Sequence, residues 1–169
     1  MFRGYAQPRY IMTVTPGIDL LNRRMRIQGL FDYRGGHKWY NNTERIRCVS
    51  RQNCSGLMNP GADFQDQAMV VATRDNPAKT LDGFFQDGAF VKLRELSVSY
   101  QLPNTLAQRY AHMRNVTLVG TARNLYTWTK YRGVDPESDY VATTGSDSPS
   151  EFQTIAAPTY FIFRINLGF

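Results

Sequence analysis

The segment PTYFIFRINLGF, residues 158–169, alternates regularly between apolar and polar or small side chains. Phe161, Phe163, Ile165 and Leu167 share one parity with Phe169, whereas Arg164, Asn166 and Gly168 share the other. A period of two is the pattern of a β-strand with one apolar face. The segment is therefore expected to be a strand, whose apolar face meets either lipid or a shared protein core.

Four earlier stretches alternate in a similar way. The expected strands lie at about 9–20, 23–34, 88–102, 115–129 and 158–169. Pro16 lacks a ladder donor, so we expect a bulge or a strand end there. In the third strand the apolar parity changes between Leu93 and Leu96, which predicts a bulge or a departure from the apolar layer.

The connections between these strands are alternately short and long. Short links follow the first strand (DLLNRR) and the third (PNTLAQRYAHMRN, with about one helical turn). Long polar connections span about 35–87, with a helical patch expected at 64–73, and about 130–157. In an antiparallel meander, both long connections then leave the same end of the sheet. Outer-membrane barrels combine long extracellular loops with short periplasmic turns in this way.

Aromatic residues flank the expected strands at both ends. Tyr33, Tyr126, Trp128 and Tyr160 would lie beside the long loops, and Tyr100 with Phe169 at the other end. Such girdles and strands of about ten residues favour an all-β, up-and-down membrane barrel. Five strands cannot close a barrel, so further strands are expected. The alternative is a soluble, secreted β-sandwich that binds carbohydrate through its loop aromatics.

The distribution of charge and the length of the apolar runs limit which functions the chain is expected to have. The net charge is +6, yet the basic residues are scattered and only Arg23 and Arg24 are adjacent, so we do not expect a nucleic-acid partner. The arginines expected on the inward face, toward a plug or a watery lumen, are Arg24, Arg26, Arg94, Arg123 and Arg164. No apolar run is long enough for a transmembrane helix, and the opening residues do not resemble a signal peptide.

Cys48 and Cys54 lie six positions apart in a polar segment. Neither His37 nor His112 stands at zinc-ligand spacing from them. The pair is therefore expected to be a small loop disulfide, with two free thiols as the alternative.

The sequence offers few candidate catalytic, metal-binding or ligand-binding residues. Asp135, Glu137 and Asp139 suit a surface turn better than an acid–base pair or a calcium site. His37, Trp39 and Tyr40 are possible substrate-loop contacts that stack on a sugar ring, or residues that pack the loop. Because no nucleophile or catalytic constellation stands out, we expect no enzymatic activity and no cofactor.

Three segments resemble the closing part of SusC/RagA-type TonB-dependent transporters. They are DGAFVKLRELSVSYQLP (87–103), ARNLYTWTKYRGVDPE (122–137) and the final FRINLGF. The segment GGHKWYNNTERIRC (35–48) also resembles a loop of that family. The motif positions are Asp87, Gly88, Asn124, Leu125, Trp128, Tyr131, Gly133, Asp135, Pro136 and Glu137.

The resemblance implies the last five strands of a plugged 22-stranded barrel in the bacterial outer membrane, without the plug domain. It implies the import of oligosaccharides or peptides, with a SusD-like surface lipoprotein over the loops and TonB acting through a missing N-terminal part. Phe163, Ile165, Leu167 and Phe169 match the signal read by the barrel-assembly machinery. The remaining strands, the plug and membrane lipid would be further partners.

Overall fold

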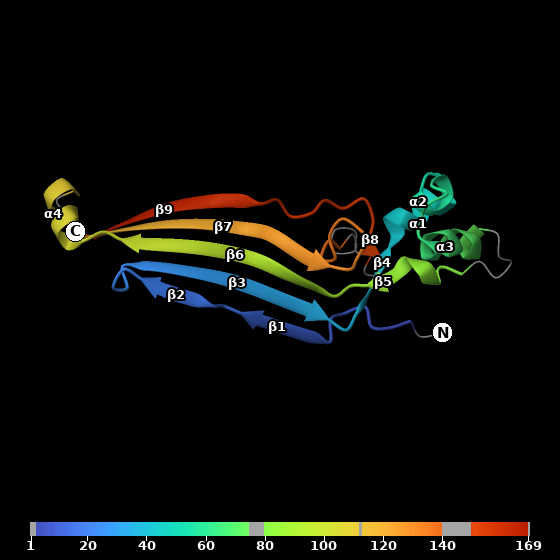
Figure 1. Cartoon of the computed structure of the whole chain (residues 1–169), viewed down its shortest axis with the longest axis horizontal. Helices are drawn as coiled ribbons and strands as arrows, with labels where there is room; N and C mark the ends of the chain where they lie inside the picture. The colour runs from blue at the N-terminus through green and yellow to red at the C-terminus, as the bar shows by residue number, and fades with distance from the viewer. Residues whose placement is uncertain (1–2, 75–79, 112, 140–149, 169) are drawn as a thin grey trace. The chain divides into compact units, whose positions relative to one another are not determined.

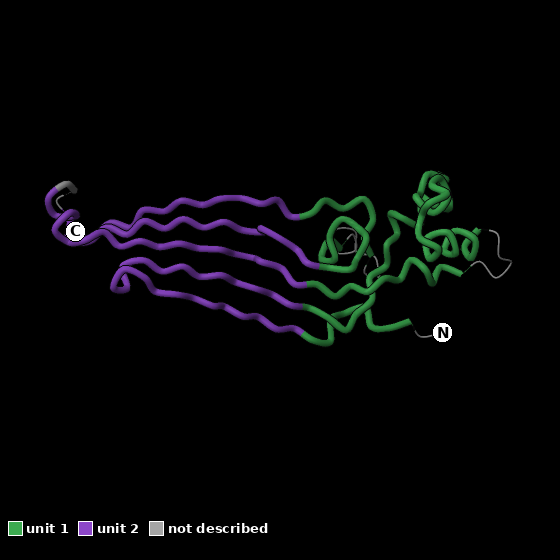
Figure 2. Tube along the Cα trace, in the orientation of Figure 1, with its two compact units in different colours: residues 1–10, 34–90, 129–156 green, residues 11–33, 91–128, 157–169 purple. Residues whose placement is uncertain are grey.

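A computed structural model describes residues 3–74, 80–111, 113–139 and 150–168. The chain divides into two compact units, which are coloured separately in Figure 2. Unit 1 comprises residues 1–10, 34–90 and 129–156, and unit 2 comprises residues 11–33, 91–128 and 157–169. Several strands continue from one unit into the other.

Unit 2 is built on one large sheet whose strand order is β1-β3-β6-β7-β9, with β2 also paired to β3 (Figure 1). Its strands are β1 (Tyr10–Val14), β2 (Gly17–Leu20), β3 (Met25–Gly35), β6 (Phe90–Gln101), β7 (Asn115–Thr129) and β9 (Tyr160–Gly168). β2–β3 and β7–β9 are antiparallel pairs. The sheet follows chain order, which is the antiparallel meander that the alternation predicts.

The first expected strand, 9–20, is divided in two. β1 ends at Val14 and β2 begins at Gly17, so the break falls at Pro16. Proline has no N–H to give to a ladder, but the Pro16 carbonyl accepts a hydrogen bond from the Gly29 N–H at 3.0 Å. The strand end therefore sits where the sequence places the proline.

The long connection from 35 to 87 is more regular than its sequence suggests. It holds β4 (Lys38–Asn41), α1 (Asn42–Val49), α2 (Ser55–Met58), α3 (Phe64–Arg74), the 3₁₀ turn η1 (Asp82–Phe84) and β5 (Phe85–Asp87). The expected helical patch at 64–73 matches α3, but α1, α2 and the small sheet β5-β4-β8 were not expected. β8 is Ser150–Glu151.

The link after β6 also contains more helix than expected. α4 (Asn104–Ala111) has eight residues, about two turns rather than one. No helix of the described part of the chain is both long and apolar enough to cross a membrane.

Ion pairs locate the parity change in β6. The Arg94 Nε donates to Asp32 at 2.9 Å, and the Arg123 Nε donates to Glu95 at 2.7 Å. Asp32 and Arg123 both lie on the polar parity of their strands, so the neighbours Arg94 and Glu95 reach the same face. Alternation is therefore interrupted at these two residues, as the switch between Leu93 and Leu96 predicts.

The apolar face of the sheet carries large exposed side chains. In the β7–β9 register, Phe163 pairs with Gly120 and Ile165 with Leu118, which places the C-terminal apolar residues on the face of β7 that is apolar. Phe161 is 79% exposed and Phe163 69% exposed. A sandwich would bury these side chains against a second layer, so the exposure contradicts the soluble-sandwich alternative.

Asn124 lies within β7 in a left-handed conformation, with a φ of 54°. Its Nδ2 donates to the Pro158 carbonyl at 3.0 Å, and the Thr159 hydroxyl donates to the Asn124 carbonyl at 2.7 Å. Asparagine tolerates this backbone region better than most residues. The motif position thus ties β7 to the segment that begins β9.

We predict that Asn124→Gly is milder than Asn124→Val. Glycine keeps the left-handed backbone and loses only the side-chain bond, whereas a β-branched residue adds backbone strain of about 1 kcal/mol or more. The measurement is the urea midpoint of the far-UV circular dichroism of the detergent-solubilised chain. Equal midpoints for the two variants would contradict the conformational role.

Candidate functional site

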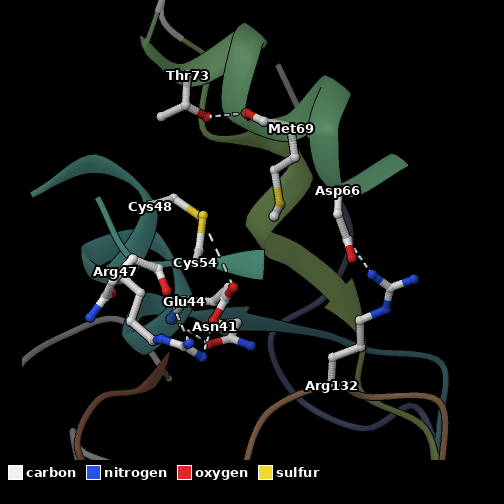
Figure 3. Close-up of a disulfide and its surroundings, with 10 residues drawn as sticks. Asn41, Glu44, Arg47, Cys48, Cys54, Asp66, Met69, Thr73 and Arg132 are labelled. Carbon is white, nitrogen blue, oxygen red and sulfur yellow. Dashed lines mark hydrogen bonds and ion pairs between the residues drawn. A yellow bond between two sulfur atoms is a disulfide. The ribbon is translucent and has the colours of Figure 1, made fainter. Parts of the chain in front are cut away.

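The core of unit 1 is built around a disulfide. Cys48, in α1, is bonded to Cys54 (Figure 3). Both cysteines are buried in one cluster with Val70 and Phe84. Closing a loop of this length stabilises a fold by about 2 kcal/mol in the chain-entropy model. The bond therefore holds α1 and the start of α2 against α3 in a unit with a small apolar core.

The helix α1 begins at a side-chain cap. The Glu44 N–H donates to the Asn41 Oδ1 at 2.9 Å, and Arg47 pairs with the Glu44 carboxylate one turn later. Asparagine is a favoured N-cap because its side-chain oxygen satisfies a free helix N–H. The Asn-x-x-Glu sequence at 41–44 is thus a local signal for this helix.

Arg132 connects the second long connection to α3. Its guanidinium pairs with Asp66 and, at 3.4 Å, with Asp63, and its backbone N–H donates to the Gln86 side chain at 3.0 Å (Figure 3). Together these contacts hold residue 132 beside α3 and β5. Asp63 and Asp66 provide this anchor.

A buried carboxylate organises the motif around residue 131. Glu151 is 1% exposed and accepts hydrogen bonds from the Tyr131 hydroxyl at 2.9 Å and from the Val134 N–H at 2.8 Å. Burial and the neighbouring Glu151 carboxylate raise the pKa of Tyr131 well above its usual value, so its hydroxyl stays protonated and donates.

Gly133 packs so closely against Glu151 and Tyr131 that no larger residue fits at this position. A Cβ at this position would lie 1.9 Å from the Glu151 Oε2 and 2.3 Å from the Tyr131 ring. Asp135 and Pro136 are also buried, and the Asp135 carboxylate accepts from the Glu137 N–H at 2.9 Å. The Tyr-x-Gly-x-Asp-Pro-Glu pattern is thus a folded turn closed over Glu151.

The possible substrate contacts lie inside unit 1. His37 is 3% exposed and Trp39 is 7% exposed, while Tyr40 is partly buried and stacks on Phe85. These rings pack the loop in this structure and leave little surface for a ligand. Gly88 is required by the same packing, because a Cβ there would lie 2.6 Å from the His37 Nε2.

The remaining motif positions lie within strands or at their ends. Asp87 ends β5 and accepts a hydrogen bond from the Ala89 N–H at 3.1 Å. In unit 2, Trp128 stacks near Phe31 with ring centroids 6.5 Å apart, and Leu125 is partly buried. Of the expected assembly signal, Phe163, Ile165 and Leu167 lie in β9, whereas Phe169 lies outside the described residues.

An open cleft of about 420 Å³ lies within unit 1. It is lined by basic, acidic and apolar groups, among them Lys38, Lys130, Arg132, Asp87, Met69 and Phe85. Arg132 is already paired with α3, whereas Lys38 and Lys130 form no ion pair with the described residues. The cleft can therefore offer two ammonium groups and an apolar wall to a ligand.

Glu44 approaches the two cysteine sulfurs, and the three groups lie within 4.8 Å of one another. A disulfide sulfur is not a thiolate, so this cluster does not provide the ligand set of a metal site.

Sequence reasoning did not find Glu151, Arg132 or the cleft lysines. Glu151 follows a long polar segment with no local pattern, and its partners are distant in the chain. Only the Asn-x-x-Glu cap offered a signal, and it could have revealed α1.

We predict that Gly133→Ala destabilises unit 1 by about 1–3 kcal/mol, because the added methyl overlaps the Glu151 carboxylate. Trp39 fluorescence in a Trp128→Phe background reports the urea midpoint. Gly120→Ala is the matched control, since a Cβ there meets nothing within 4 Å. An unchanged Trp39 midpoint in Gly133→Ala would contradict the packing argument.

Reduction of the disulfide should lower the stability of unit 1 by about 2 kcal/mol. We expect dithiothreitol to speed tryptic cleavage at Arg47 and Arg51 in the wild-type chain. The Cys48→Ala/Cys54→Ala double variant should be cleaved rapidly with or without the reductant. Reductant-independent cleavage of the wild type would show that the bond does not hold this segment.

Unit 1 should lose stability on mild acidification. Burial, with a smaller contribution from Arg34, lowers the pKa of His37 below 6.5, although Asp87 opposes this shift. The stability linked to neutral His37 is complete above about pH 6.5, the unfolded value, and is lost as the pH falls toward the lower folded value. His37→Gln should remove this component from the Trp39 unfolding midpoint, and an unchanged pH dependence would contradict it.

No protein-family model matches the chain. A curated protein named TonB-dependent receptor P3, from Formosa agariphila, is 37% identical over 57 residues, which cover 34% of this chain and 6% of that protein. The chain therefore spans a small part of the length of this relative.

Solved structures of the RagAB peptide importer share the fold. The match to the importer in its 'open-open' state covers 97% of this chain and 17% of the importer chain, with a TM-score of 0.65 and 20% sequence identity. A second RagAB peptide transporter structure covers 90% and 16%, with a TM-score of 0.66 and 20% identity. The chain is therefore similar over 57 residues to a protein named TonB-dependent receptor P3, and it shares the fold of part of the RagAB importer structures.

Proposed function

We propose that the chain forms wall and loops of an outer-membrane, TonB-dependent nutrient importer. The observation that carries this proposal is the exposed apolar face of the large sheet, on which Phe161 and Phe163 are mostly uncovered. Apolar side chains at alternate positions of a meander are stable when lipid surrounds them. The likeness to the RagAB importer structures supports the same setting.

The cleft of unit 1 is the candidate substrate contact. Lys38 and Lys130, which form no ion pair among the described residues, suit carboxylates, and Met69 with Phe85 offers apolar contact. Peptides carry both kinds of group, so we favour peptides over oligosaccharides as the imported class. RagAB, which shares the fold of this chain, is a peptide importer, and this likeness supports the choice.

The partners proposed for the intact protein follow from the same role. A SusD-like lipoprotein would cover the loops, TonB would act through a plug domain, and the assembly machinery would read β9. Further strands would pair with the edges of the sheet, because an open edge is not stable in lipid. We assign the chain no catalytic step.

Import can be tested in the bacterium that encodes the chain. We expect uptake of a labelled peptide library to fall several-fold in a Lys38→Gln/Lys130→Gln variant, because the cleft loses both free ammonium groups. Uptake should also require TonB, and the protein should be recovered in the outer-membrane fraction.

Arg51→Gln/Arg74→Gln is the matched control, since it removes two unit 1 charges that do not line the cleft. Equal peptide uptake in both variants would show that the cleft lysines do not contact the imported substrate. Recovery of the wild-type protein in the soluble fraction would contradict the importer role and favour a secreted β-domain.

A further inference from the structure

A second cleft, also of about 420 Å³, lies in unit 2 where β2 turns into β3 and β6 leads into α4. Polar groups line most of it: Asn22, Arg23, Arg24, Gln101, Asn104 and Thr105. It belongs to the end of the sheet that carries the short connections. None of the ten motif positions lines this cleft, and the proposed import role does not use it.

Backbone hydrogen bonds fix the walls of this cleft. The Gln101 N–H donates to the Arg24 carbonyl at 2.7 Å, and the Leu102 N–H donates to the Val116 carbonyl at 2.9 Å. The turn itself has three successive left-handed residues, Leu21, Asn22 and Arg23, with φ values of 52°, 55° and 65°. Such a conformation is unfavourable for side chains larger than glycine, and strain of this kind tends to occur at binding sites.

The charges of unit 2 leave the cleft strongly basic. The unit contains three side-chain carboxylates, each paired with an arginine: Asp19 with Arg26, Asp32 with Arg94 and Glu95 with Arg123. Arg23 and Arg24 are exposed and form no ion pair among the described residues. Two adjacent arginines that line one cleft therefore have no ion-pair partner among the residues that the structure describes.

Exposed leucines are close in the chain to the residues that line the cleft. Leu20 is 39% exposed and Leu21 is 62% exposed, directly before Asn22 in the chain. Leu106, which is 43% exposed, follows the lining residues Asn104 and Thr105 in the chain. A ligand that fits this surface has an anionic head and an apolar body.

We propose that this cleft binds the phosphate group of an anionic phospholipid, with the acyl chains along the neighbouring leucines. Arginine forms forked hydrogen bonds to phosphate oxygens, which suits the Arg23–Arg24 pair. The polar side chains of Asn22, Asn104 and Thr105 complete the head-group site. This inference rests on the membrane setting of the proposed function.

Native mass spectrometry of the full chain in detergent micelles tests the site. We expect the wild type to retain phosphatidylglycerol in preference to phosphatidylcholine. Arg23→Gln and Arg24→Gln should each weaken retention about tenfold, the usual effect of losing one charge-assisted hydrogen bond. Arg24→Lys should keep part of the affinity because it keeps the charge.

Arg164→Gln is the matched control, since it removes one sheet arginine that does not line the cleft. An equal loss in this control, or no preference for phosphatidylglycerol, would overturn the proposal. Inorganic phosphate that competes with equal affinity would show a free-anion site and overturn the lipid assignment. Far-UV circular dichroism of each variant verifies the sheet. Since the readout is lipid retention and not uptake, failure here leaves the import proposal standing, and failed uptake leaves this one standing.

Discussion

In the membrane setting proposed above, the large sheet of unit 2 would depend on contact between its apolar face and the surrounding lipid. Met12, Phe161 and Phe163 each expose more than half of their surface, and burying such side chains is the main source of stability for a single sheet. In water these apolar side chains would be unfavourably hydrated. In hydrocarbon they would need no second protein layer to cover them. On the polar face, charged side chains are paired across strands, as in Arg94 with Asp32 and Arg123 with Glu95.

Unit 1 is stabilised by different interactions. It replaces an extensive apolar core with a buried disulfide, a helix cap, the Arg132 anchor and the carboxylate of Glu151. The last two join segments far apart in the chain, so the two long connections fold as one body and not as separate loops. Motif positions such as Tyr131, Gly133 and Gly88 have structural roles in that body, which explains why a specific spacing is needed.

The sequence predicted the sheet well because strand alternation is a local signal. The boundaries of β7 coincide with the expected 115–129, and the strand break at Pro16 follows from a missing donor. Unit 1 was harder to predict because its contacts are distant: Glu151 bonds Tyr131 across twenty positions, and Arg132 reaches Asp66 across sixty-six. Aromatic residues alone suggested ligand contact at His37 and Trp39, yet burial places them in the packing.

Spin labels placed singly at positions 161 to 165 of the chain in phospholipid bilayers test most directly whether the apolar face meets lipid. We expect labels at 161, 163 and 165 to collide mainly with oxygen dissolved in lipid, while labels at 162 and 164 collide mainly with a water-soluble nickel chelate. Collision rates without this period of two, or labels at 161 and 163 shielded from both reagents, would show that the apolar face packs against protein and contradict the membrane setting.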